Sequence, residues 1–212
     1  MTKTVLTFGD SNTYGTPPAT ARGENRRFGP ETRWPAILQD ILSPDWAVIE
    51  EGLPGRTTCL ADPVMGPHMD GQIGLRIALE SHGPIDLLVI MLGTNDVQLH
   101  HQSSPDQIVG GLARLLAIAR SEPYQTRHGG FDILLICPPP VLEQGIYRDT
   151  LMGARAKSLA LAPLVAGLAA HWGIPFLDAG AHISSSQIDG IHFDAQDHLT
   201  LGKAIAAKIS AL

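Results

Sequence analysis

The sequence predicts an α/β fold with three layers, α/β/α, around a five-stranded parallel sheet of the flavodoxin-like type. Two observations lead to this prediction. Short apolar runs rich in β-branched residues alternate along the chain with longer segments of helical periodicity. The 212 residues also suit one domain, 1–212, with a full hydrophobic core, and are too few for an eight-stranded barrel.

Five apolar runs have the composition of buried strands. They are Thr4–Phe8, Ala47–Glu50, Asp86–Leu92, Asp132–Cys137 and Pro175–Leu177. Because helical segments separate them, neighbouring strands are expected to run parallel, with helices covering both faces of the sheet. In such sheets ligands bind beyond the carboxyl ends of the strands, so residues that follow these runs are the first candidates for a site.

The segments between these runs have helical spacing, and several carry end signals. The predicted helices are 34–42, 73–81, a helix after Ser104, 153–172 and 195–209. Ser104-Pro105-Asp106-Gln107 combines a capping serine, a proline at the first helical position and the glutamine of a capping box. Asp194 is the expected N-cap of the last helix.

Two long stretches lack any periodicity. Gly15–Arg33 follows the first predicted strand and Pro138–Asp149 follows the fourth. Both are therefore expected to overhang the edge of the sheet where a ligand would bind. Their aromatic and apolar residues, Tyr147 among them, would suit an acyl chain or an aromatic leaving group.

Composition excludes several classes of function. A net charge of −6 without any Lys/Arg-rich run argues against a nucleic-acid partner. The longest strongly apolar stretch, Leu87–Leu92, is far too short to cross a membrane. Cys59 and Cys137 lack CxxC spacing and fit a reducing compartment. With no secretory signal visible before the first strand, the expected location is the cytoplasm.

Four polar blocks lie at the predicted strand ends or before the last helix. They are Gly9-Asp10-Ser11-Asn12, Glu51-Gly52-Leu53-Pro54-Gly55-Arg56-Thr57-Thr58, Gly93-Thr94-Asn95-Asp96 and Asp189-Gly190-Ile191-His192-Phe193. Each is ordinary alone. Together they place serine, glycine, asparagine, aspartate and histidine at one edge of one sheet.

Three residues in these blocks form a candidate catalytic triad. Ser11 alone is typical of a turn or a helix cap, but a serine hydroxyl becomes a nucleophile when a neighbouring base takes its proton. His192 is the candidate base, because imidazole changes charge near neutrality. Asp189 lies three residues earlier, so one turn can present both side chains, with the carboxylate orienting the ring. The absence of a GxSxG elbow does not oppose this interpretation, because triads recur on unrelated folds.

These blocks resemble those of the SGNH hydrolases, which are the GDSL-type esterases and lipases. GDS near the N-terminus, GTND in the middle and DxxH near the C-terminus occur in the right order along the whole chain. The blocks are most similar to those of bacterial arylesterases with acyltransferase activity. Asn12 stands where the commonest form of the first block has leucine, which bears on the substrate rather than on the reaction.

This resemblance implies an SGNH-hydrolase fold and a serine esterase acting on small, short-chain acyl esters, with acyl transfer to alcohols and homo-oligomer formation. It implies an oxyanion hole made by the backbone N–H groups of Ser11 and Gly55 and the side-chain amide of Asn95. Gly52 lies close enough in sequence to remain an alternative donor. We expect Asn12, Tyr14 and Ile191 to contact the substrate.

Two other functions remain open. Asp10 and Asp96 most simply bond backbone amides of their loops, but with Asp189 and His192 they could instead hold metal ions in a phosphoesterase. That reading leaves Ser11 and Asn95 without a role, so no metal and no cofactor are expected, and a chelator would distinguish the two. A non-catalytic carbohydrate- or acyl-binding module is disfavoured, because all the catalytic residues are present. The other histidines form no HxH or HExxH pair, and His100-His101 is expected on a solvated loop.

Overall fold

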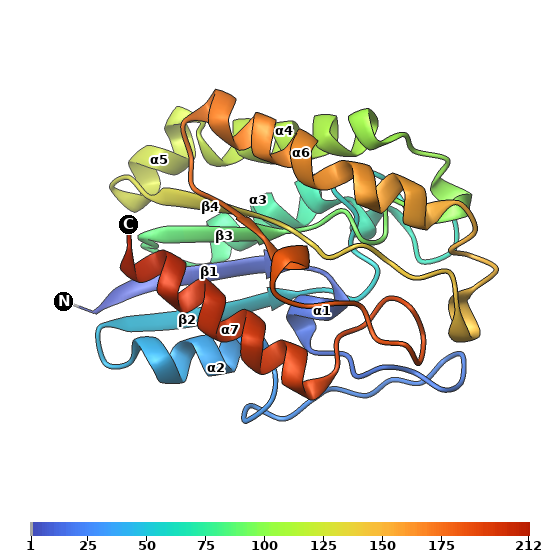
Figure 1. Cartoon of the computed structure of the whole chain (residues 1–212). Coiled ribbons are helices and arrows are strands. Elements are labelled where there is room, and N and C mark those ends of the chain that lie inside the picture. The colour runs from blue at the N-terminus through green and yellow to red at the C-terminus, as the bar shows by residue number, and fades with distance from the viewer. Residues whose placement is uncertain (1) are drawn as a thin grey trace.

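The computed structural model describes residues 2–212, which contain one parallel sheet (Figure 1). Its strands are β1 (Lys3–Gly9), β2 (Trp46–Gly52), β3 (Leu87–Met91), β4 (Asp132–Cys137) and β5 (Phe176–Asp178). Their order across the sheet is β2-β1-β3-β4-β5, and every pair is parallel. The predicted flavodoxin-like sheet is therefore confirmed.

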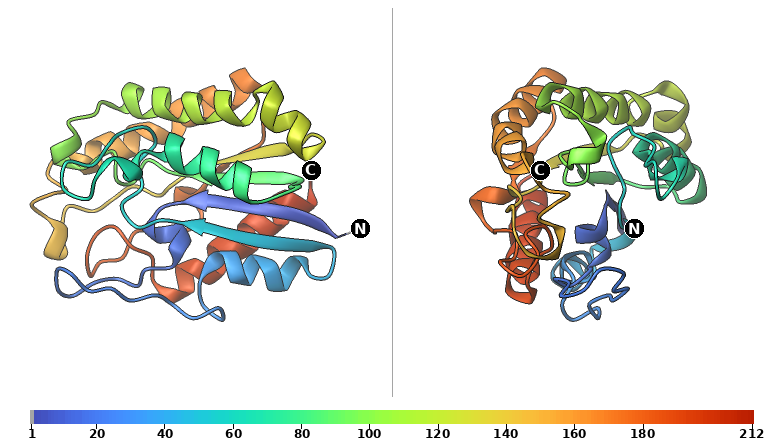
Figure 2. Two further views of the ribbon diagram at one scale, coloured as in Figure 1. Left: turned by 180° about the vertical axis from the view of Figure 1, so that it is seen from behind. Right: turned by 90° about the vertical axis from the view of Figure 1, so that its right-hand side faces the viewer.

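Helices cover both faces of this sheet, as Figures 1 and 2 show. They are α1 (Ser11–Tyr14), α2 (Trp34–Leu42), α3 (Gly71–Ser81), α4 (Pro105–Ala119), α5 (Glu122–His128), α6 (Ala154–Trp172) and α7 (Ala195–Ser210). Helices α2 and α7 pack on one face, and α3, α4 and α6 pack on the other. Within residues 2–212, no helix combines the length and the apolar character needed to cross a bilayer.

The alternation of side chains along β1 divides the core into two. Val5 packs with α2 and α7, whereas Leu6 and Phe8 face the cluster under α3, α4 and α6. Successive residues of a strand point to opposite faces, so a strand buried on both sides is apolar throughout. This explains why the strands were recognisable as continuous apolar runs.

Two helices begin at the residues that the sequence signals indicate. At α4, the Ser104 hydroxyl accepts the Gln107 backbone N–H at 3.2 Å and the Gln107 side chain accepts the Ser104 N–H at 2.8 Å, so the capping box is confirmed. Asp194 is the N-cap residue of α7, as predicted, although its carboxylate accepts the Ser186 hydroxyl at 2.9 Å and no backbone N–H of the helix. Helices α1 and α5 were not predicted, because both are short.

Both aperiodic stretches lie beyond the carboxyl ends of the strands, at the right of Figure 1. Residues 15–33 and 138–149 contain no helix or strand apart from the 3₁₀ turn Gly145–Tyr147. The segment before α7 reaches the same edge, so three loops from distant parts of the chain converge there.

Candidate active site

The turn before α7 holds a tightly bound aspartate–histidine pair. Oδ2 of Asp189 lies 2.7 Å from Nδ1 of His192 and also accepts the Ala19 N–H at 2.8 Å. Oδ1 accepts the backbone N–H groups of Ile191 and His192, both at 3.0 Å. Burial raises the pKa of Asp189, but these hydrogen bonds outweigh it and hold the pKa below its usual value. An ionised carboxylate at Nδ1 leaves Nε2 of His192 free to act as a base.

Ser11 begins α1 directly after β1 and shares a cavity of about 260 Å³ with His192. Asp10 caps this helix, because its Oδ1 accepts the Asn12 N–H at 2.9 Å. Ser11 is only 3% exposed, so its hydroxyl is sheltered from bulk water but open to the cavity it lines.

Asn12 connects the serine turn to the histidine turn. Its Nδ2 donates to the carbonyl of Ile191 at 3.1 Å, and the side chain is fully buried. Since Ile191 directly precedes His192, this bond fixes the position of the proposed base relative to the proposed nucleophile. Asn12 is not among the residues that line the cavity, so its contact with the substrate stays a prediction.

Gly55 and Asn95 also line the cavity, beside Ser11. Within residues 2–212, the backbone N–H groups of Ser11 and Gly55 donate to no protein acceptor. Gly55 has φ of +89°, a backbone conformation that favours glycine. Gly52 ends β2, paired with Gly9, and does not line the cavity. The geometry thus favours Gly55 over Gly52 as the donor.

The amide of Asn95 is held in one orientation. Its Nδ2 donates to the carbonyl of Arg56 at 2.9 Å, and its Oδ1 accepts Nε2 of Gln98 at 3.0 Å. An amide nitrogen carries two hydrogens, so one remains for an acceptor in the cavity. Asn95 thereby ties its own loop to the loop that carries Gly55.

Asp96 joins the same two loops. Its carboxylate accepts the Thr58 backbone N–H at 3.0 and 3.1 Å and the Thr58 hydroxyl at 2.5 Å. Burial raises the pKa of Asp96 to about 6, against the opposing effect of these bonds. Burial likewise raises the pKa of Asp10 to about 6. Asp10 bonds a backbone amide of its own turn, as predicted, whereas Asp96 bonds the backbone amide of Thr58 in the neighbouring loop.

Arg56 anchors the Gly55 loop to the core from beneath. The guanidinium is buried, donates to the carbonyl of Gly9 at 2.9 Å and stacks 4.0 Å over the ring of Phe8. Burial lowers the pKa of Arg56 to about 10, so the group stays charged at neutral pH. The end of β1, which leads into Ser11, and the loop carrying Gly55 are thus bound by one side chain.

Comparison with known proteins agrees with this geometry. The model of the GDSL-like lipase/acylhydrolase family matches residues 7–200. The chain belongs to this family. A search of curated proteins found no match.

Two solved structures resemble this esterase over 99% of both chains. The aryl esterase of M. smegmatis is 35% identical with a TM-score of 0.92. A carbohydrate acetylesterase from Sinorhizobium meliloti is 35% identical with a TM-score of 0.93. The chain is thus a carboxylic ester hydrolase with the SGNH-hydrolase fold.

The cavity of this esterase includes residues that the sequence did not single out. Its lining is Ser11, Thr16, Glu24, Asn25, Arg26, Pro54, Gly55, Met65, Asn95, Gln98, Tyr147, Ile191 and His192. Ile191 and Tyr147 were expected there. Tyr14 is not among the lining residues, and Arg27 lies over its ring at a centroid distance of 4.4 Å, so its contact with the substrate stays a prediction. The position of Gln98, three residues after Asn95, could have indicated that it lines the cavity, whereas nothing in the sequence around Met65 indicated this.

Tyr147 connects the two long loops to the base. Its ring stands edge-on to His192 with centroids 6.0 Å apart, and the Arg22 guanidinium lies 5.8 Å from its centroid. The nearby backbone of the second loop is also bound, because the N–H of Leu142 donates to the carbonyl of Gly190 at 2.8 Å. A Cβ on Gly190 would lie 2.1 Å from the Leu142 carbonyl oxygen, so glycine permits this close approach.

The alternative of a metal phosphoesterase receives no support from the donor geometry. Within residues 2–212, the one group of three or more His, Cys, Asp or Glu side chains close enough to share a cation is Asp62, His100 and His101. It includes neither the aspartates nor the histidine of the active site. His100 is exposed, as expected for a solvated loop, whereas the His101 side chain is only 3% exposed.

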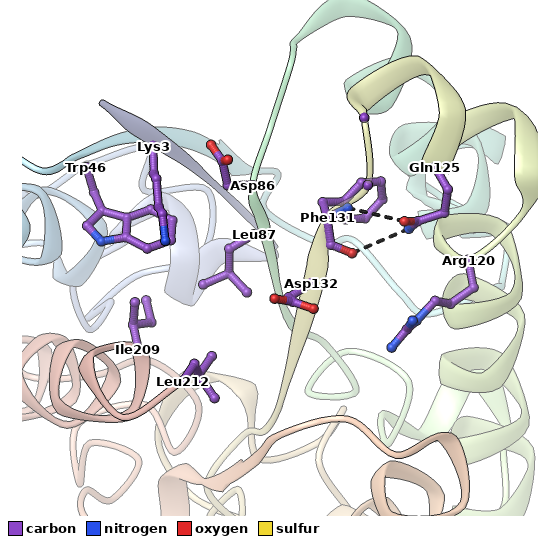
Figure 3. Close-up of a pocket in the computed structure, with 12 residues that line it drawn as sticks. Lys3, Trp46, Asp86, Leu87, Arg120, Gln125, Phe131, Asp132, Ile209 and Leu212 are labelled. Carbon is purple, nitrogen blue, oxygen red and sulfur yellow. Dashed lines mark hydrogen bonds between the residues drawn. The ribbon is translucent and has the colours of Figure 1, made fainter. Parts of the chain in front are cut away.

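A larger cavity of about 470 Å³ lies at the opposite edge of the sheet (Figure 3). Lys3, Asp86 and Asp132 surround it at the amino ends of β1, β3 and β4. Its lining contains no serine, cysteine or histidine. This larger cavity therefore offers no candidate nucleophile or base for ester hydrolysis.

Proposed function

We propose that Ser11, His192 and Asp189 hydrolyse short-chain acyl esters through an acyl-enzyme. One observation carries the proposal: Ser11, His192, Gly55 and Asn95 line a single cavity, and His192 is hydrogen-bonded to an ionised Asp189. Nucleophile, base, orienting carboxylate and oxyanion donors thus meet at one point.

In the first step, Nε2 of His192 takes the hydroxyl proton of Ser11 while Oγ bonds to the ester carbonyl carbon. The carbonyl oxygen gains negative charge and accepts hydrogen bonds from the N–H of Ser11, the N–H of Gly55 and the amide of Asn95. The carbon–oxygen bond to the alcohol then breaks, and His192 returns the proton to the departing alkoxide.

Water completes hydrolysis by the same route in reverse. His192 takes a proton from water, the hydroxide adds to the acyl carbon, and the acid leaves as Ser11 recovers its proton. An alcohol can replace water in this step and yields a new ester. Acyl transfer to alcohols is thus part of the proposal.

The cavity supports a small acyl group. Its volume of about 260 Å³ lies below that of most drug-sized ligand sites. Apolar contacts come from Pro54, Met65 and Ile191, whereas Glu24 and Arg26 give the first loop a polar lining. The solved relatives are an aryl esterase and a carbohydrate acetylesterase, which favours acetyl or similarly short esters.

We also infer a homo-oligomer in which another subunit narrows the opening of the cavity. Met65 lines the cavity yet is 48% exposed, and the neighbouring Val64 is 90% exposed. Such apolar residues at a site opening suit a protein contact. Light scattering at several protein concentrations tests this, and a monomer throughout would contradict it.

The decisive experiment is a series of p-nitrophenyl esters of increasing acyl length, assayed with and without a serine-reactive phosphonate. We expect the highest kcat/KM for the shortest chains and complete inactivation, with one phosphonate on Ser11 by peptide mass spectrometry. Added alcohol should yield the transfer ester. Labelling at another residue, or a preference for chains of about twelve carbons, would contradict the proposal.

A further inference from the structure

Outside the active site, three side chains from two separate segments converge. Asp62 lies in the turn closed by the hydrogen bonds between Asp62 and Gly66, and His100 and His101 form the end of the 3₁₀ turn Leu99–His101. Oδ2 of Asp62 lies 3.2 Å from Nε2 of His100 and 3.6 Å from Nε2 of His101. The two imidazole rings lie 4.0 Å apart between centroids. Three potential ligand atoms therefore surround one point.

The carboxylate is already oriented for this role. Oδ1 of Asp62 accepts the backbone N–H groups of Val64 at 2.8 Å and Met65 at 2.7 Å. These bonds fix the side chain and leave Oδ2 directed at the histidines. Metal-binding carboxylates are commonly held in place by hydrogen bonds of this kind.

We propose that Asp62, His100 and His101 form a binding site for a zinc ion. Two imidazoles with one carboxylate are an established zinc ligand set, with water as the fourth ligand. Ligand atoms about 2.1 Å from a tetrahedral zinc ion are about 3.4 Å apart, and the observed separations are 3.2 and 3.6 Å. His100 keeps 35% of its side chain exposed, which gives the ion access from solvent.

Such an ion would join two walls of the catalytic cavity without touching the triad. Met65 follows Asp62 in its turn, and Gln98 directly precedes the segment with the two histidines; both line the cavity. Gln98 also holds Oδ1 of Asn95. The bound ion is therefore structural: it stabilises the fold and fixes these walls, and hydrolysis does not pass through it.

Calorimetric titration of untagged, chelator-treated protein with zinc chloride tests the site. We expect one ion per chain and a rise in Tm on binding. His100→Ala should weaken binding by more than about tenfold, because loss of even an outer ligand partner costs that much. Asp62→Asn should also weaken it, since the amide oxygen can still accept the turn bonds while a strong anionic ligand is lost.

The matched control is His171→Ala, which removes an exposed histidine at the end of α6. It should bind zinc as the wild type does. Cobalt(II) substitution should give the intense visible absorption of a tetrahedral site, and His100→Ala should lose it. Wild-type binding no tighter than that of His100→Ala, or a Tm that zinc leaves unchanged, would overturn the proposal.

Discussion

The two edges of the sheet differ in how far their polar side chains are buried. At the amino edge, Lys3, Asp86, Arg120 and Asp132 surround the larger cavity and are exposed to water. Asp86 also accepts the Thr4 backbone N–H at 2.7 Å. At the carboxyl edge, Asn25 and Arg26 of the smaller cavity are exposed, but a second set of polar residues is buried. They are Asp10, Ser11, Arg56, Thr58, Asn95, Asp96, Asp189 and His192.

A buried polar group lowers the stability of the fold unless it is hydrogen-bonded, and the fold must place its hydrogen-bond partner within reach. At the carboxyl edge nearly every such group holds a loop that carries one part of the site. Polar groups are thus buried, despite the free-energy cost, at the edge where fixed hydrogen-bond donors are needed for the proposed reaction. The amino edge contains similar residue types but no such network, so substitutions there should matter little.

The largest expected effect is that of Ser11→Ala. Loss of the nucleophile should reduce kcat by about 10⁴-fold or more and abolish phosphonate labelling. The matched control is Arg120→Ala at the exposed amino edge, which should leave kcat and Tm unchanged. Initial rates and circular-dichroism melts on both variants test this. Ester hydrolysis by Ser11→Ala near the wild-type rate would reject the covalent mechanism.

Asp189→Asn should follow in size, with a loss of about 10³–10⁴-fold in kcat. An amide at this position cannot stabilise the imidazolium, and its NH₂ group can face Nδ1 and reverse the tautomer of His192. Initial rates and thermal melts of both proteins test this, and a folded Asp189→Asn variant with kcat near the wild-type value would contradict the orienting role of Asp189.

Most of the carboxyl edge was predictable because the strands are buried on both faces. Continuous apolar runs such as Asp132–Cys137 can be read directly, and every block that ends a parallel strand must lie at the same edge. Short elements such as α5 were missed because seven residues give little periodicity. The sequence therefore indicated which residues meet, though not how the loops are held.

Contacts between distant backbone atoms account for what was not predictable. The hydrogen bond from the Ala19 N–H to Asp189 depends on how the first loop folds back, and no side chain in that loop indicates it. The bond from Nδ2 of Asn12 to the carbonyl of Ile191 likewise joins residues that lie 179 positions apart, so the sequence could not indicate it.

Asn95→Ala should cost less than either triad variant, about 10²–10³ in kcat, or roughly 3–4 kcal/mol. The donor acts on charge that develops in the transition state, so KM should change little. A role limited to holding the loop predicts a different result, because the carbonyl of Arg56 and the amide of Gln98 would lose their partner. In that case Tm would fall while kcat per folded molecule stayed near the wild-type value.

The smallest effect is expected from Asp96→Asn, and it concerns stability against pH. Burial raises the pKa of Asp96 from 3.8 to about 6 in the folded state, so the folded state binds more protons between these values. Its contribution to stability is therefore largest below about pH 4 and is lost as the pH rises toward 6. An asparagine does not titrate, so the Tm of the wild type should fall relative to that of Asp96→Asn as the pH rises through this range.

Asp132→Asn at the exposed amino edge is the control and should change Tm little at either end of the pH range. Thermal melts at both ends of the range decide the matter: a wild type that instead gains stability over Asp96→Asn with rising pH would mean that the Thr58 bonds outweigh burial and keep Asp96 ionised.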